Sequence, residues 1–279
     1  MKKILTAMLS ISLLLAMVVP AFASPAYPEI ESTKIGYDLK GTLDKMLDEG
    51  QLLINSQGRF ELASDRAEST LSVDQYTDLC YRILLLNSSI ALGTAKITQD
   101  GHGIDFVTDL SALTSFGDTT ANQEVEAIDH ALYEMLETRA VVRSSHQCTY
   151  NKLSLGFMVS ANKKIIEDYY QSILAVNPTA ATNSTIGYWI ARVQEGGVWD
   201  YKRNSEIGPW DNISCCDYWT YTNAHRTAEW IGNYNYGYTG AFLFSLSVLK
   251  AGSFAASGFR ETDSADWPAI EEGFTHSTS

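Results

Sequence analysis

Apolar residues recur at helical spacing over long stretches of this chain, and this periodicity constrains the fold more than any other feature. The first predicted helix starts at a capping box, Ser72-Val73-Asp74-Gln75, and carries its apolar face on Val73, Tyr76, Leu79, Cys80, Ile83 and Leu84. Similar helices are predicted from Thr120 onward and over residues 163–176. Segments 52–62 and 95–107 alternate around Gln-Gly and Asp-Gly turns, which predicts small hairpins. We therefore expect a mainly α fold with minor hairpins.

The chain begins with the pattern of a secretory signal peptide. Lys2 and Lys3 form a short basic head, an apolar run follows to Val19, and Ala21-Phe22-Ala23 matches an A-x-A cleavage site. This predicts cleavage after Ala23 and a secreted product without stable membrane insertion. A polar, proline-containing stretch at 177–184 predicts a connection between a mainly helical region of unknown role, 24–177, and an aromatic-rich, mostly helical domain, 178–279.

Charge and cysteine content narrow the ligands to expect. The formal net charge is −13, so the average field of the protein repels polyanions, although a local basic patch would still bind one. The four cysteines are Cys80, Cys148, Cys215 and Cys216, and the two adjacent ones are not expected to bond each other. Free thiols, or bridges from this pair to Cys80 or Cys148, both fit the sequence. The spacing does not fit a zinc site, and we expect neither a metal nor a cofactor.

Two aromatic motifs carry the residue types that chemistry needs. In GGVWDYK (196–202), Gly196-Gly197 is expected to end a helix over 185–195, so that Trp199, Asp200 and Lys202 emerge at a fixed place. A long aromatic loop is expected to follow, to about residue 227. Gly237 and Gly240 are then expected to punctuate the entry to an apolar helix over 241–256. Asp200 and Lys202 would form an acid–base pair that orients a polar substrate, or else a surface ion pair beside a packed tryptophan.

The second motif is EWIGNYNYG (229–237). Asn233 and Asn235 alternate with Tyr234 and Tyr236, which predicts one face of amides and one of phenols that contact sugars, bases or peptide groups. The alternative is a loop whose asparagines satisfy backbone groups and whose tyrosines fill a core. We expect both motifs to face one cleft, with Gly232, like Gly196-Gly197, placed so that the backbone can turn or approach closely.

Together these motifs resemble the bacterial polymorphic toxin type 44 domain, which has GGPWDYK-like and GNFNYGATG-like elements followed by an apolar helix. The likeness covers about residues 185–260, with Val198 in place of the usual proline and Tyr238 in place of alanine. It implies a mainly helical toxin domain, a hydrolase with ribonuclease-like activity used in interbacterial competition, and an immunity protein as partner.

Metal-independent cleavage of RNA needs a base, an acid and a cation. Asp200 or Glu229 is the candidate base, and Lys202 or Arg192 the candidate cation. His225 lies outside the motifs but is the candidate acid. The candidate substrate-binding residues are Arg192, Trp199, Asn233, Asn235 and Tyr236.

Two other functions fit the same residues. A cell-envelope hydrolase would use Asp200 and Glu229 on a peptidoglycan glycan strand, beside a wall of aromatic rings. A secreted carbohydrate- or surface-binding module would use the aromatic rings without any reaction.

Overall fold

The computed structural model describes residues 35–63, 71–101, 103–107, 119–139, 155–201, 213–217, 222–226, 228–256 and 266–279. For the ends of one helix and for residues 213–217 and 222–226, only the backbone is described. The expected signal peptide and Lys202 lie outside these ranges. Within them, none of the helices combines the length and the apolar character that a membrane span requires.

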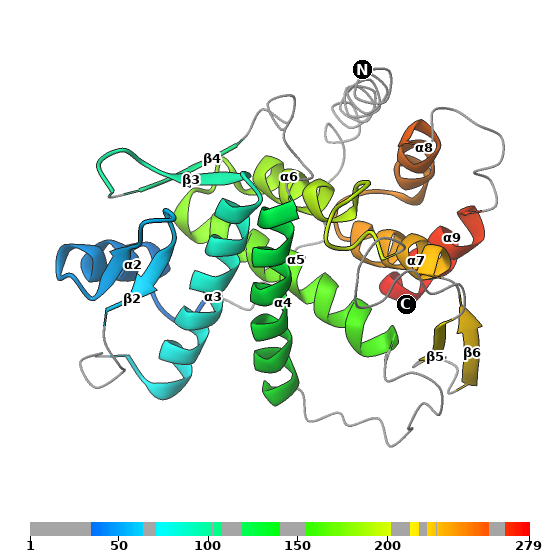
Figure 1. Cartoon of the computed structure of the whole chain (residues 1–279), viewed down its shortest axis with the longest axis horizontal. Helices are drawn as coiled ribbons and strands as arrows, with labels where there is room; N and C mark the ends of the chain where they lie inside the picture. The colour runs from blue at the N-terminus through cyan, green and yellow to red at the C-terminus, as the bar shows by residue number, and fades with distance from the viewer. Residues whose placement is uncertain are drawn as a thin grey trace. The chain divides into compact units, whose positions relative to one another are not determined.

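The described chain is mainly α-helical with short antiparallel hairpins, which confirms the predicted fold class (Figure 1). The helices are α2 (Leu39–Asp48), α3 (Val73–Ala91), α4 (Thr119–Arg139), α5 (Leu155–Val176), α6 (Ala181–Val193), α7 (Ala228–Gly240), α8 (Leu246–Ala256) and α9 (Trp267–Thr278). The hairpins pair β1 (Leu52–Ile54) with β2 (Phe60–Leu62), β3 (Ala95–Ile97) with β4 (Ile104–Phe106), and β5 (Ile213–Asp217) with β6 (Thr222–Arg226).

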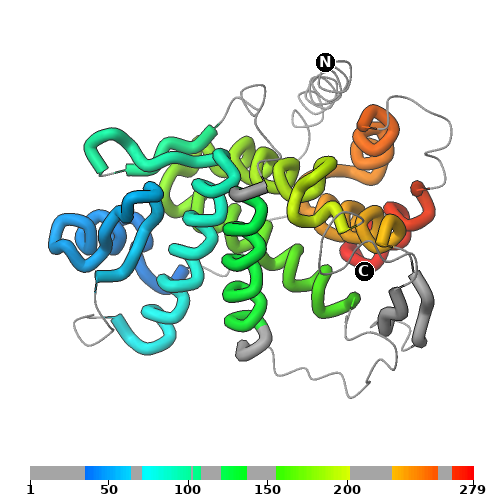
Figure 2. The backbone as a smooth tube through the Cα atoms, in the orientation of Figure 1, coloured from blue at the N-terminus to red at the C-terminus, as the bar shows by residue number. Residues whose placement is uncertain are grey.

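These elements form two compact units that interleave along the sequence. The backbone in Figure 2 is coloured by residue number, so the residue ranges of each unit can be located along the chain. Unit 1 contains residues 140–164 and 192–279, and unit 2 contains residues 29–139 and 165–191. Residues 177 and 178, where the sequence predicts the connection between two regions, both lie in unit 2. The difference arises because α5 and α6 each run from one unit into the other, joined by a tight turn at 177–180 in which Ala180 N–H donates to the Asn177 carbonyl.

The predicted capping box starts α3, since Ser72 Oγ accepts from Gln75 N–H and the Gln75 side chain accepts from Ser72 N–H.

Hydroxyl groups join three helices of unit 2. Tyr169 of α5 hydrogen bonds Ser89 of α3 at 2.7 Å and Ser184 of α6 at 2.8 Å. Its ring stacks on Tyr188 with centroids 4.0 Å apart. These buried polar groups satisfy one another, and burial raises the pKa of the Tyr169 phenol.

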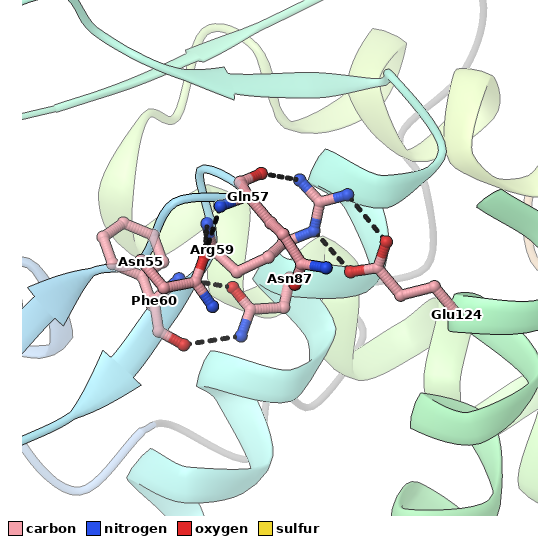
Figure 3. Close-up of polar contacts among 6 residues, drawn as sticks. All are labelled: Asn55, Gln57, Arg59, Phe60, Asn87 and Glu124. Carbon is pink, nitrogen blue, oxygen red and sulfur yellow. Dashed lines mark hydrogen bonds and ion pairs between the residues drawn. The ribbon is translucent and has the colours of Figure 1, made fainter. Parts of the chain in front are cut away.

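The β1–β2 hairpin of unit 2 is fixed by side chains from two helices (Figure 3). Asn87 of α3 accepts from Phe60 N–H at 2.8 Å and donates to the Phe60 carbonyl at 2.9 Å. Arg59, in the turn, makes a bidentate ion pair with Glu124 of α4 at 2.6 and 2.9 Å. Both predicted hairpins, 52–62 and 95–107, are therefore confirmed, with Gly58 and Gly101 in the left-handed region.

In unit 1, α7 and α9 cross with their backbones in contact. A Cβ atom on Gly237 would collide with the Ile270 carbonyl oxygen, and one on Gly273 with the Tyr234 carbonyl oxygen. Only glycine permits this approach. Gly237 of α7 thus lies against Ile270 of α9, and Tyr234, earlier in α7, lies against Gly273, later in α9. The two helices are therefore antiparallel.

The structure corrects four local expectations. The helix predicted over 185–195 spans Ala181–Val193. The segment 203–227, expected as a long loop, contains the β5–β6 hairpin. The segment 232–240, in which Gly237 was expected to punctuate the entry to a helix, is itself the helix α7. The apolar helix expected over 241–256 begins only at Leu246.

Candidate functional site

The GGVWDYK segment forms a tight turn directly after α6. Gly196 has φ +78°, as expected of a glycine that ends a helix, and Trp199 N–H returns to the Arg192 carbonyl at 2.9 Å. Asp200 is 9% exposed, and its Oδ2 accepts from Gly196 N–H at 2.9 Å. The carboxylate predicted to be a catalytic acid or base therefore closes this turn.

The buried side chains of Arg192 and Trp199 pack against each other at this turn. Arg192, in the last turn of α6, is fully buried, and its guanidinium lies 4.8 Å from the centre of the Trp199 ring. A desolvated cation–π contact of this kind stabilises by about 2 kcal/mol. The two residues predicted to bind substrate thus contact each other inside unit 1.

Asn162 of α5 brings the two motifs together. Its Nδ2 donates to Tyr201 Oη at 2.7 Å and to Asn235 Oδ1 at 2.8 Å. Tyr201 belongs to the GGVWDYK turn and Asn235 to α7, and all three side chains are buried. Asn162 was not among the predicted site residues, because nothing in the periodicity of α5 distinguishes an amide that joins distant motifs from one that caps a local backbone group.

The second motif does not present a face of amides. It lies within α7, where residues two apart point in different directions, so Asn233 and Asn235 do not share a face. Asn235 is buried and Asn233 half-buried. The expected division into amide and phenol faces is wrong, because it assumed the two-residue period of an extended chain.

The remaining predicted residues of α7 are Tyr236 and Glu229. Tyr236 Oη donates to the Leu249 carbonyl of α8 at 3.1 Å, and burial raises the pKa of its phenol. Tyr236 therefore holds α7 against α8. Glu229 lies in the first turn of α7 and is exposed, which makes it the accessible carboxylate of the two predicted ones.

A cluster that the sequence analysis did not single out lies between α7, α9 and α5. The rings of Trp230, Tyr234 and Tyr238, at positions i, i+4 and i+8, stack with centroids 5.0 and 6.1 Å apart. Tyr234 Oη hydrogen bonds His276 Nδ1 of α9 at 2.7 Å. Lys163 of α5 lies 5.7 Å from the centre of the Tyr238 ring. The four-residue spacing of these three aromatic residues is the sequence pattern that could have predicted this stack on one face of a helix.

Other predicted residues fall partly or wholly outside the described residues. His225 lies on β6 opposite Ser214, but only its backbone is described, and Lys202 is not described. Cys80 carries a free thiol whose pKa is raised by burial. The side chains of Cys148, Cys215 and Cys216 are outside the described part. Within that part, no three His, Cys, Asp or Glu side chains are grouped as metal ligands would be.

The two motifs therefore meet through one buried amide, while an imidazole, an ammonium group and an exposed carboxylate lie on the helices around them. Whether the motifs also face a cleft stays a prediction. Comparison with known proteins adds no family, since no protein-family model, curated protein or solved structure matches this chain.

Proposed function

We propose that this protein is a secreted, toxin-like hydrolase whose unit 1 cleaves RNA. The observation that carries the proposal is the double hydrogen bond of Asn162, which joins the GGVWDYK turn to α7. Two motifs held in register by a buried polar contact are typical of a site whose geometry matters, because such a contact must be satisfied to be stable.

The carboxylates favour RNA over a glycan strand as the substrate. Glycosidases need two carboxyl groups that flank the scissile bond, one as acid and the other as base or nucleophile. Asp200 is buried and accepts from the Gly196 backbone, whereas Glu229 is exposed on α7. One accessible carboxylate with a histidine and a lysine suits phosphodiester cleavage better.

The proposal implies that the protein acts after it enters another cell. Its net charge of −13 disfavours a general affinity for RNA, so recognition would depend on the local cations of unit 1. A cell that makes the protein would need an immunity protein to protect its own RNA.

The test compares two substrates. The purified mature chain, residues 24–279, is incubated with mixed RNA and with isolated peptidoglycan sacculi. We expect RNA fragments and intact sacculi. In a test bacterium, the same chain should arrest growth when retained in the cytoplasm and not when exported.

A matched pair of variants connects this activity to the carrying observation. Asn162→Leu should lower RNA cleavage by about 100-fold, since displacing reacting groups by about 1 Å has effects of that size. Asn177→Leu, in the turn between α5 and α6, should not. Digestion of sacculi would support the envelope hydrolase instead, and binding without turnover of either substrate would support the non-catalytic module.

A further inference from the structure

We propose that His276, oriented by Tyr234, is the general acid of this protein, with Glu229 as the base and Lys163 as the cation that faces the phosphate. This inference rests on the proposed cleavage of RNA and names the groups that perform it. His276 thus takes the role of acid that the sequence predicted for His225, and Lys163 takes the role of cation predicted for Lys202.

The register of α7 against α9 places the acid and the base at one end of the helix pair. Tyr234 lies opposite Gly273, and the helices are antiparallel. Continuing in the same register, the first turn of α7, which carries Glu229, lies level with the last turn of α9, which carries His276. A carboxylate and an imidazole are thus brought to the same end of the pair by a backbone contact that does not allow the helices to slide.

Tyr234 fixes the orientation of the imidazole. The 2.7 Å hydrogen bond engages His276 Nδ1, and the Tyr234 ring meets the imidazole edge-on with centroids 5.8 Å apart. Tyr234 is buried and stacked on Trp230 and Tyr238, so its own position is fixed. With Nδ1 held in this way, Nε2 is the nitrogen through which His276 exchanges a proton, as in other sites where a partner sets the role of the ring.

Lys163 supplies positive charge at the same end. Its Nζ donates to the carbonyl of Ser277, the residue after His276, at 2.9 Å. Lys163 directly follows Asn162 on α5, so the residue that joins the two motifs also fixes the starting point of this side chain. An ammonium group held at the backbone of the last turn of α9 would stabilise the charge that develops on the phosphate oxygens.

The reaction balances with these groups alone. Glu229 takes the proton of the ribose 2′-hydroxyl, and the 2′-oxygen forms a bond to phosphorus. The bond from phosphorus to the 5′-oxygen breaks, and protonated His276 gives its Nε2 proton to that oxygen. The products are a 2′,3′-cyclic phosphate end and a free 5′-hydroxyl end, and no oxidant, reductant or co-reactant is required.

The test separates the acid from the base by the leaving group. A mixed-sequence oligoribonucleotide needs a proton on its leaving oxygen, whereas nucleoside 3′-(4-nitrophenyl) phosphates release nitrophenolate without one. In the mature chain, His276→Gln should lower kcat/KM on the oligoribonucleotide by about 100- to 10,000-fold and should leave cleavage of the esters close to wild type. Glu229→Gln should lower both, because both substrates need the base. Tyr234→Phe should lower kcat on the oligoribonucleotide more than on the esters.

The controls are His130→Gln and Glu134→Gln, which make the same changes at exposed positions of α4 in unit 2 and should behave as wild type. Thermal melting checks that each variant is folded. Equal loss on both substrates in folded His276→Gln, or no loss on either, overturns the role of His276 while RNA cleavage by the wild type upholds the proposed function. A wild type that cleaves neither substrate overturns both proposals.

Discussion

Single buried amides connect distant segments in both units of this protein. Asn87 joins both backbone groups of Phe60 to α3, and Asn162 joins Tyr201 to Asn235. Each amide supplies hydrogen bonds to two buried polar groups that water would hydrogen bond in the unfolded chain. Removing one such side chain therefore leaves more than one buried polar group without a partner, which costs about 1–3 kcal/mol for each group.

Asn87 gives the clearest test at this scale. Asn87→Ala should lower the free energy of unfolding by about 2–4 kcal/mol, because the Phe60 N–H and carbonyl groups lose their partners together. Asn87→Asp should be destabilising too, since a carboxylate oxygen would then face the Phe60 carbonyl. Urea denaturation followed by circular dichroism measures both changes. Asn177→Ala, at a surface turn, should change the value by no more than about 0.5 kcal/mol; an equal loss there would contradict the explanation.

At the scale of the elements, the glycines of α7 have opposite roles. A Cβ atom on Gly237 would enter the α9 backbone, whereas nothing lies within 4 Å of a Cβ atom on Gly232. The expectation that Gly232 allows a turn or a close approach is therefore wrong. The close approach occurs further along α7, at Gly237, where α9 crosses.

This contrast predicts opposite signs within one helix. Gly237→Ala should destabilise the protein by about 1–3 kcal/mol, because the two backbones must separate. Gly232→Ala should stabilise it by about 0.5–1 kcal/mol, since alanine is the better helix former and meets no obstacle. Thermal unfolding of both variants distinguishes the two effects. Similar stabilisation by both would mean that helix propensity, and not the crossing, controls α7.

The elements also mark where sequence reasoning succeeded. The helix after Ser72 was predictable because a capping box and an apolar face agree, and the hairpins because Gly58 and Gly101 satisfy turns that need positive φ. The NYNY run of α7 fits a period of two as well as a helix over so few residues. Only Trp230 and Tyr238, one turn to each side of Tyr234, favour the helix. Partners such as Asn162 and His276 depend on tertiary contacts that no local pattern encodes.

At the scale of the whole molecule, the two units share continuous helices. Residues 155–164 of α5 belong to unit 1 and residues 165–176 to unit 2. If unit 1 unfolded alone, α5 would start at Ile165 and its first backbone N–H groups would lose their acceptors. Shared helices therefore couple the stability of one unit to that of the other.

We expect this coupling to make unfolding a single cooperative step. Five of the six tryptophans fall in the residue range of unit 1 and only Trp189 in that of unit 2, so fluorescence reports mainly on unit 1, whereas far-ultraviolet circular dichroism reports on both. The two signals should change at the same urea concentration. Gly237→Ala should shift both midpoints together. Separate midpoints would mean that the units unfold independently.

The position of Asn162 in the chain limits how this protein can be recombined. A single genetic crossover at any codon from 165 to 191 would transmit Tyr201 and Asn235 to the new gene but leave Asn162 behind. The hybrid would inherit both aromatic motifs and lose the amide that connects them. A single crossover keeps these three residues together only if it falls upstream of codon 162 or downstream of codon 235. Shuffled genes that keep Asn162 with Tyr201 and Asn235 should therefore be recovered as functional far more often than genes that separate them.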